Sequence, residues 1–153
     1  MKIKGLIEED FANYKKPSMT VMFPYCTFKC GTEYCQNTAL AEAPIIDVSV
    51  NELVKRYLYN PLTESIVVQG LEPFDSWDDL KEFVQKIREY TNDDIVIYTG
   101  YNRDEIEDKI TALRKHRNII VKFGRFLCND KYVYDKTLGV TLASSNQYAE
   151  RIS

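Results

Sequence analysis

Short apolar segments alternate with helix-forming segments three times along the chain, and this alternation restricts the fold more than any other feature. The segments span residues 18–23, 65–69, 95–98 and 119–123, and the last three are rich in Val and Ile. Each of the four is followed within two residues by a glycine or a proline. Continuous apolar strands are typical of parallel sheets with both faces covered. Successive strand, helix, strand units with right-handed crossovers build such a sheet. We therefore predict an α/β fold with a mostly parallel sheet.

Capping residues and apolar spacing predict three helices between these strands. The first follows Ser49, which forms a capping-box pattern with Glu52. The second begins at Ser76 with acidic residues in its first turn, where they favour the helix dipole. The third follows Asn102 and is expected to include His116, the only histidine.

The length of 153 residues predicts one domain, residues 1–153. A complete eight-fold β/α barrel needs roughly 250 residues, so any barrel formed here must be an open, truncated one. Residues 124–153 are less regular, with Leu138–Leu142 as the candidate for a last strand. Residues 1–17 fit either a strand or an N-terminal turn.

The charge pattern excludes several functional classes. The net charge is −3, and no basic block is present, which argues against nucleic-acid binding through phosphate neutralisation. No apolar run reaches the ~18 residues of a membrane helix. The first residues carry acids where a signal peptide would have its apolar core, so we expect a cytoplasmic protein without a membrane partner.

Three of the four cysteines are grouped on one predicted loop, residues 24–37. Cys26, Cys30 and Cys35 fall within ten residues, whereas Cys128 stands alone and is expected to be structural or incidental. Grouped cysteines in a cytoplasmic protein are more typical of metal sites than of disulfides. Three thiolates suit a 4Fe-4S cluster with one open iron, whereas structural zinc takes four ligands. The sequence offers no obvious fourth ligand, which favours the cluster over zinc.

Four segments directly follow the predicted parallel strands. They are the cysteine loop and residues 69–73, 98–101 and 123–126. Ligands and catalytic groups of parallel α/β folds lie at the carboxyl ends of the strands. We therefore expect these segments to share one edge of the sheet.

The order of these motifs resembles that of radical S-adenosylmethionine (SAM) enzymes. The loop Cys26-Thr-Phe-Lys-Cys30 to Tyr34-Cys35 resembles their cluster loop, and Gln69-Gly-Leu-Glu-Pro73 resembles their Gly-Gly-Glu-Pro segment. The later segments Tyr98–Tyr101, Phe123–Phe126 and Ala143–Gln147 are similar to those of one subgroup, the activating proteins of anaerobic (class III) ribonucleoside-triphosphate reductases. The resemblance extends from about residue 18 to residue 150.

The resemblance implies a fold, an activity and partners. The fold would be an open, partial β/α barrel of the radical SAM type. A reduced 4Fe-4S cluster would cleave SAM to methionine and a 5′-deoxyadenosyl radical, which takes hydrogen from a glycine of the anaerobic reductase. An electron donor such as flavodoxin would reduce the cluster. The catalytic groups would be the cluster and SAM themselves.

The resemblance also implies roles for individual residues. Cys26, Cys30 and Cys35 would ligate the cluster. The expected SAM contacts are Tyr34, Gln36, Gly70, Leu71, Glu72 and Thr99. Ser145 and Asn146 are candidates for contact with a ligand or partner.

Two departures from the family pattern leave other functions open. Four residues separate Cys30 from Cys35, where the family has two, and Leu71 replaces the second glycine of the Gly-Gly-Glu-Pro segment. If that glycine provides a positive φ, leucine cannot replace it without strain. The alternatives are a radical SAM enzyme acting on a small molecule, and a non-enzymatic interaction module that binds an iron–sulfur cluster or zinc.

Overall fold

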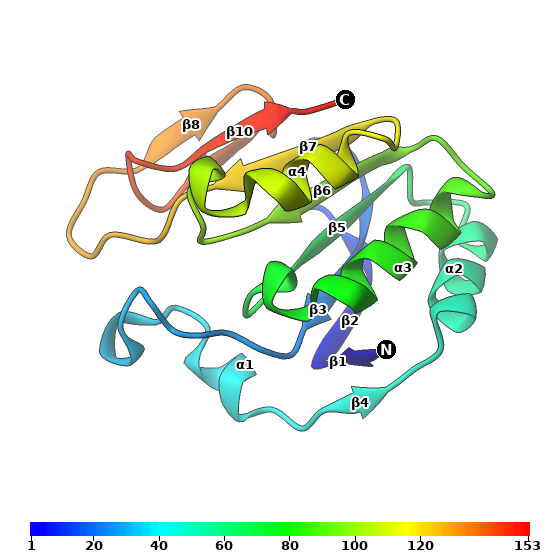
Figure 1. Ribbon diagram of the computed structural model, residues 1–153, viewed down its shortest axis with the longest axis horizontal. Coiled ribbons are helices and arrows are strands. Elements are labelled where there is room, and N and C mark those ends of the chain that lie inside the picture. The colour runs from blue at the N-terminus through cyan, green and yellow to red at the C-terminus, as the bar shows by residue number, and fades with distance from the viewer.

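A mixed six-stranded sheet forms the centre of the molecule (Figure 1), which is described for residues 1–153 by a computed structural model. The strand order is β10-β7-β6-β5-β3-β2. The four central strands are parallel, and the edge strands β2 and β10 are antiparallel to their neighbours. Their bounds are Gly5–Asp10 (β2), Ser18–Phe23 (β3), Ser65–Gly70 (β5), Asp94–Tyr98 (β6), Ile119–Phe123 (β7) and Tyr148–Arg151 (β10). The four parallel strands are those predicted from the apolar segments.

Four α-helices and three 3₁₀ turns connect these strands. The helices are α1 (Thr38–Glu42), α2 (Val50–Tyr59), α3 (Trp77–Arg88) and α4 (Glu107–Leu113), and the turns are η1 (Thr32–Tyr34), η2 (Pro73–Ser76) and η3 (Arg103–Ile106). None of the helices combines the length and the apolarity needed to span a membrane.

Two of the predicted helix caps are confirmed and one is wrong. The Ser49 hydroxyl accepts a hydrogen bond from Glu52 N at 3.1 Å, and Asn102 forms a capping box. Ser76 precedes α3 but makes no cap bond, and its buried hydroxyl has no partner. The turn η2 comes first and is capped by Glu72, whose carboxylate accepts from Phe74 N. Helix α4 ends at Leu113, so the prediction that this helix includes His116 was wrong.

Two small antiparallel pairs complete the structure. Strand β1 (Lys2–Ile3) pairs with β4 (Ile46–Asp47), and β8 (Val133–Asp135) pairs with β9 (Val140–Leu142). The strand predicted at Leu138–Leu142 is confirmed only for Val140–Leu142. Residues 1–17, for which a strand or a turn was expected, contain the strands β1 and β2. Strands β8 and β10 were not predicted, because short and largely exposed strands carry little apolar pattern.

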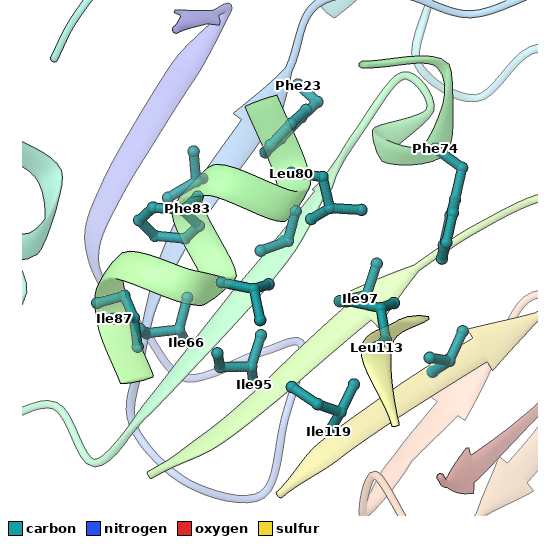
Figure 2. Close-up of a cluster of buried hydrophobic side chains, with 14 of the residues drawn as sticks. Phe23, Ile66, Phe74, Leu80, Phe83, Ile87, Ile95, Ile97, Leu113 and Ile119 are labelled. Atoms are coloured by element: carbon teal, nitrogen blue, oxygen red, sulfur yellow. The ribbon is translucent and has the colours of Figure 1, made fainter. Parts of the chain in front are cut away.

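The larger core lies between the sheet and the helices. Figure 2 shows Phe83 and Ile87 of α3 packed over Ile66 and Ile95 of the sheet, all of them with no exposed surface. The same cluster includes Leu113 of α4 and further residues of α2. Burial of each such side chain contributes about 2 kcal/mol. The helices therefore cover the four central strands on this face.

The opposite face carries a smaller core. Val67, Val96 and Ile120 point to this side, where Tyr14 and Leu142 pack against them. Because side chains alternate along a strand, both faces of the central strands are apolar, which explains their continuous apolar sequences. The strand order has two ends, β10 and β2, that do not pair with each other, so the sheet is open.

Candidate functional site

A pocket lies at the carboxyl ends of the parallel strands. It is lined by the loop after β3 and by residues 69–72, 98–101 and 124–126, which follow the next three strands. Residues 141–143 of the β9 region form a further part of its lining. The prediction that these segments share one edge of the sheet is confirmed. In Figure 1 the cysteine loop extends from the end of β3 beyond the body of the sheet.

The three grouped cysteines all line this pocket. Cys26, Cys30 and Cys35 are partly buried free thiols, whereas Cys128 is exposed and does not line it. The loop brings the three thiols to one side of the molecule, but no three metal-binding side chains lie close enough together to hold a metal ion.

Two of the thiols accept backbone hydrogen bonds. Phe28 N donates to Cys26 Sγ at 3.2 Å, and Asn37 N donates to Cys35 Sγ at 3.4 Å. Hydrogen bonds to cysteine sulfur tune the reduction potential of iron–sulfur clusters. Burial is the main cause that raises the pKa of Cys26 to about 11, and Glu72 and Asp75 raise it further. Because of this raised pKa, the Cys26 thiol keeps its proton at neutral pH in the absence of iron. It must release that proton when it ligates iron. Three thiolates on a polar loop fit the chemistry of a 4Fe-4S cluster.

Glu72 is a buried carboxylate in this pocket, with 4% of its surface exposed. Thr99 Oγ1 donates to it at 2.8 Å, and Gly100 N donates to its other oxygen at 2.8 Å. Phe74 N donates a third bond at 3.1 Å. Burial nevertheless raises the pKa of Glu72 to about 7, because desolvation outweighs these three donors. Glu72 forms no ion pair within 4.0 Å, so it is suited to accept hydrogen bonds from a cationic ligand.

Lys122 is the second buried ionisable group of the pocket, with 7% of its surface exposed. Val121 and Phe123 point to the helical core, so Lys122 lies on the opposite face of β7. Its ammonium donates to Gly124 O at 3.1 Å and lies 5.8 Å from the centre of the Tyr98 ring. Burial lowers the pKa of Lys122 to about 8, although Glu72 opposes this effect. An ammonium has three donor hydrogens, so this group keeps capacity to bind an anionic ligand.

The predicted SAM contacts all line the pocket. Tyr34 and Gln36 are exposed, whereas Glu72 and Thr99 are buried. Leu71 has no positive φ, so the backbone at this position does not require the second glycine.

Gly70 has a structural reason to be glycine. Its φ is 110°, and an added Cβ would lie 2.6 Å from Phe23 N in the neighbouring strand. Glycine is therefore required here because the backbone of β5 passes close to the backbone of β3 at Phe23, and this reason does not involve a ligand. Gly70 still lines the pocket, and its carbonyl accepts a hydrogen bond from Asn37 Nδ2 at 3.1 Å.

Ser145 and Asn146 do not line the pocket. The Ser145 hydroxyl donates to Asp130 at 2.7 Å, and Asn146 Nδ2 donates to Arg125 O at 2.8 Å. These bonds hold the loop together. Their neighbour Gln147 does line the pocket and donates to Gly124 O at 3.2 Å.

Several pocket residues were not candidates from the sequence, and Lys122 and Asn13 are the most informative of them. Lys122 is a charged residue inside an otherwise apolar strand, Ile119–Phe123, and this interruption was the available signal. Asn13 comes from the N-terminal region, where no sequence pattern points to the pocket. Its carbonyl accepts a hydrogen bond from the Tyr98 hydroxyl at 2.7 Å, and both residues line the pocket.

A family comparison identifies an iron–sulfur protein, which agrees with the three cysteines that line the pocket. A family model described as a 4Fe-4S single cluster domain matches residues 17–148, most of the chain. The chain belongs to this family, and its cofactor is a 4Fe-4S cluster. No curated protein matches the chain. No solved structure matches it either.

Proposed function

We propose that this chain is a radical SAM enzyme with a partial β/α barrel, and that it activates a glycyl-radical enzyme. Cys26, Cys30 and Cys35 would hold the cluster, with one iron left free for SAM. The observation that carries the proposal is the convergence of three thiols, a buried glutamate and a buried lysine in one pocket at the ends of parallel strands. This set goes beyond the needs of simple cluster binding.

The two buried charges match the amino-acid end of SAM. The Glu72 carboxylate forms no ion pair within 4.0 Å and would accept hydrogen bonds from the methionine ammonium. The Lys122 ammonium has donors to spare for the methionine carboxylate. Thr99 orients Glu72 by donating to it at 2.8 Å, and Tyr34, which lines the pocket, would contact the adenine.

When bound and reduced, the cluster would supply the single electron that breaks the sulfonium C–S bond of SAM, and the resulting 5′-deoxyadenosyl group would take a hydrogen atom from the substrate. The chain's own contribution is to bind the amino-acid end of SAM and to shield the reacting atoms from water. The buried residues Glu72 and Lys122 would bind the amino-acid end of SAM at the edge of the sheet.

The proposed substrate is a glycine of anaerobic ribonucleoside-triphosphate reductase, with a flavodoxin-like protein as electron donor. The surface around the pocket favours a protein substrate, because exposed aromatic and apolar residues lie beside the pocket. Tyr34 and Tyr25 of the cysteine loop and Leu127 near the end of β7 are about half exposed. Aromatic side chains are enriched in protein interfaces.

Anaerobic reconstitution tests this proposal. The protein would be loaded with iron and sulfide, reduced with dithionite and given SAM, and 5′-deoxyadenosine would be measured. We expect about one cluster per chain and SAM cleavage, both lost in Cys30→Ala and both kept in Cys128→Ala. The variant Lys122→Met should load the cluster and bind SAM more weakly. Equal SAM affinity in Lys122→Met and wild type would refute the assigned contact.

The second candidate is a non-enzymatic cluster- or zinc-binding module. The four residues between Cys30 and Cys35 favour it, because this spacing departs from the radical SAM pattern. One zinc and no sulfide in the purified protein would support this candidate. Four iron and four sulfide would exclude the zinc form, and SAM cleavage would then distinguish the enzyme from a module that only binds the cluster.

A further inference from the structure

The two halves of the cysteine loop differ in their attachment to the rest of the molecule. The first half, residues 25–30, is bonded to the segment that follows β5. Glu72 N donates to Tyr25 O at 2.7 Å, and Thr27 N donates to Asp75 Oδ2 at 3.0 Å. Cys26 and Cys30 therefore belong to a segment fixed against the edge of the sheet.

Tyr101 adds a second attachment to the same half. The Lys29 ammonium, which lies between the first two cysteines in sequence, is 5.1 Å from the centre of the Tyr101 ring. The Tyr101 hydroxyl donates to Asp75 Oδ1 at 2.7 Å, so one carboxylate joins Tyr101 to Thr27. At this distance a cation over an aromatic face is attracted by the ring quadrupole.

Tyr101 is itself held in place from another side. The Arg125 guanidinium lies 5.3 Å from the centre of the ring and forms a two-bond pair with Glu105, with both distances 2.8 Å. This pair holds the pKa of Glu105 down at about 2, and the largest cause is the hydrogen bonding from Arg125. The ring is thus positioned by residues from the ends of three strands.

The second half of the loop, residues 31–36, makes mainly local hydrogen bonds. Tyr34 N donates to Gly31 O, and Cys35 N donates to Thr32 O. The next bond to the sheet comes from Asn37, whose amide donates to Gly70 O. The four residues between Cys30 and Cys35 all lie in this half.

We propose that Tyr101 is a positioning residue for the cluster, and that it acts through Asp75 and Lys29 on the first half of the loop. Cys26 and Cys30 are held ready, and residues 31–36 move to bring Cys35 to the cluster. The inference rests on the cluster-binding part of the proposed function and not on SAM cleavage. It also explains how the longer second spacing is accommodated, since all of it lies in the movable half.

Hydrogen exchange tests the positioning role directly. In the wild type, cluster loading should slow exchange in residues 31–37 and change residues 25–30 little. In the cluster-free Tyr101→Leu variant, residues 25–30 should exchange about tenfold faster than in the wild type. The matched control is Tyr90→Leu, because Lys86 lies 5.6 Å from that exposed ring in the same way. Tyr101→Phe keeps the ring beside Lys29 but loses the hydroxyl bond to Asp75, so it should restore only part of the protection.

The reduction potential gives an independent readout. Lys29 places a positive charge beside the cluster, which favours the reduced state, so Lys29→Met and Tyr101→Leu should both shift the midpoint to a more negative value. Tyr90→Leu should leave it unchanged. Equal exchange and equal potential in Tyr101→Leu and wild type would overturn the inference. Wild-type protein that takes up no cluster would instead refute the proposed cluster ligands, whereas a loaded wild type that leaves SAM intact would refute only the enzyme.

Discussion

The substitution Glu72→Gln should change how the stability of the cluster-free protein depends on pH. Glu72 is buried, and its pKa of about 7 lies above the ordinary value of 4.5. Between these two values the folded chain keeps a proton that the unfolded chain has lost. The folded state therefore loses stability as the pH rises through this window, and glutamine, which does not ionise, removes the effect.

The size of the effect follows from the shift. The difference between the folded-state pKa of about 7 and the ordinary value of 4.5 corresponds, at about 1.4 kcal/mol per pKa unit, to a loss of about 3 kcal/mol in the free energy of unfolding when the pH is well above 7. Between pH 5 and pH 7.5 the wild type should lose about 2 kcal/mol relative to Glu72→Gln. The glutamine amide cannot accept the bond from Gly100 N if its nitrogen faces that group, but this loss is the same at every pH.

Urea unfolding of both proteins at several values between pH 5 and pH 7.5 measures this difference. All other titrating groups contribute to both curves, so the difference between them isolates Glu72. Stopping at pH 7.5 limits the contribution of Lys122, whose pKa is about 8. We expect the two stability curves to diverge, with the wild type falling more steeply. Parallel curves would refute the conclusion that burial of Glu72 raises its pKa.

Three further predictions concern the cluster, a glycine and the core. Cys30→Ala should abolish iron and sulfide uptake, whereas Cys128→Ala should retain both, as measured by iron and sulfide analysis; equal uptake would rule out Cys30 as a ligand. Gly70→Ala should lower the free energy of unfolding by at least about 2 kcal/mol because of its positive φ and the close Phe23 backbone, and an unchanged urea midpoint would contradict this reason. Phe83→Ala should cost about 3–5 kcal/mol in the same assay, and a cost below about 1 kcal/mol would show that the core collapses around the gap.

The central fold could be predicted from the sequence because local patterns and burial agree there. Strands β3, β5, β6 and β7 are continuous apolar segments that pack on both faces. They can therefore be recognised from their own residues, without knowledge of the segments that pack against them. Strand β10 depends instead on pairing with β7, and its residues Tyr148–Arg151 carry no strand periodicity. Ser76 was misjudged because Glu72, four residues earlier, caps the turn that precedes the helix.

The candidate site was predictable where residues follow directly on a strand. The cysteine loop and Glu72 were located through this rule, since parallel strands end at one edge. Lys122 was missed because the alternation of side chains along β7 places it on the face opposite the helices. No sequence pattern indicates which face of the sheet carries the pocket. Tyr101 was grouped with its strand end, but its role in holding Lys29 and Asp75 depends on three loops meeting in space.

The measurement that tests the central claim most directly is the formation of 5′-deoxyadenosine from SAM. Protein loaded anaerobically with iron and sulfide and then reduced should release it, and Glu72→Gln should release less at limiting SAM because the acceptor for the methionine ammonium is weakened. Reduced wild-type protein that carries a full cluster and leaves SAM intact would contradict the account.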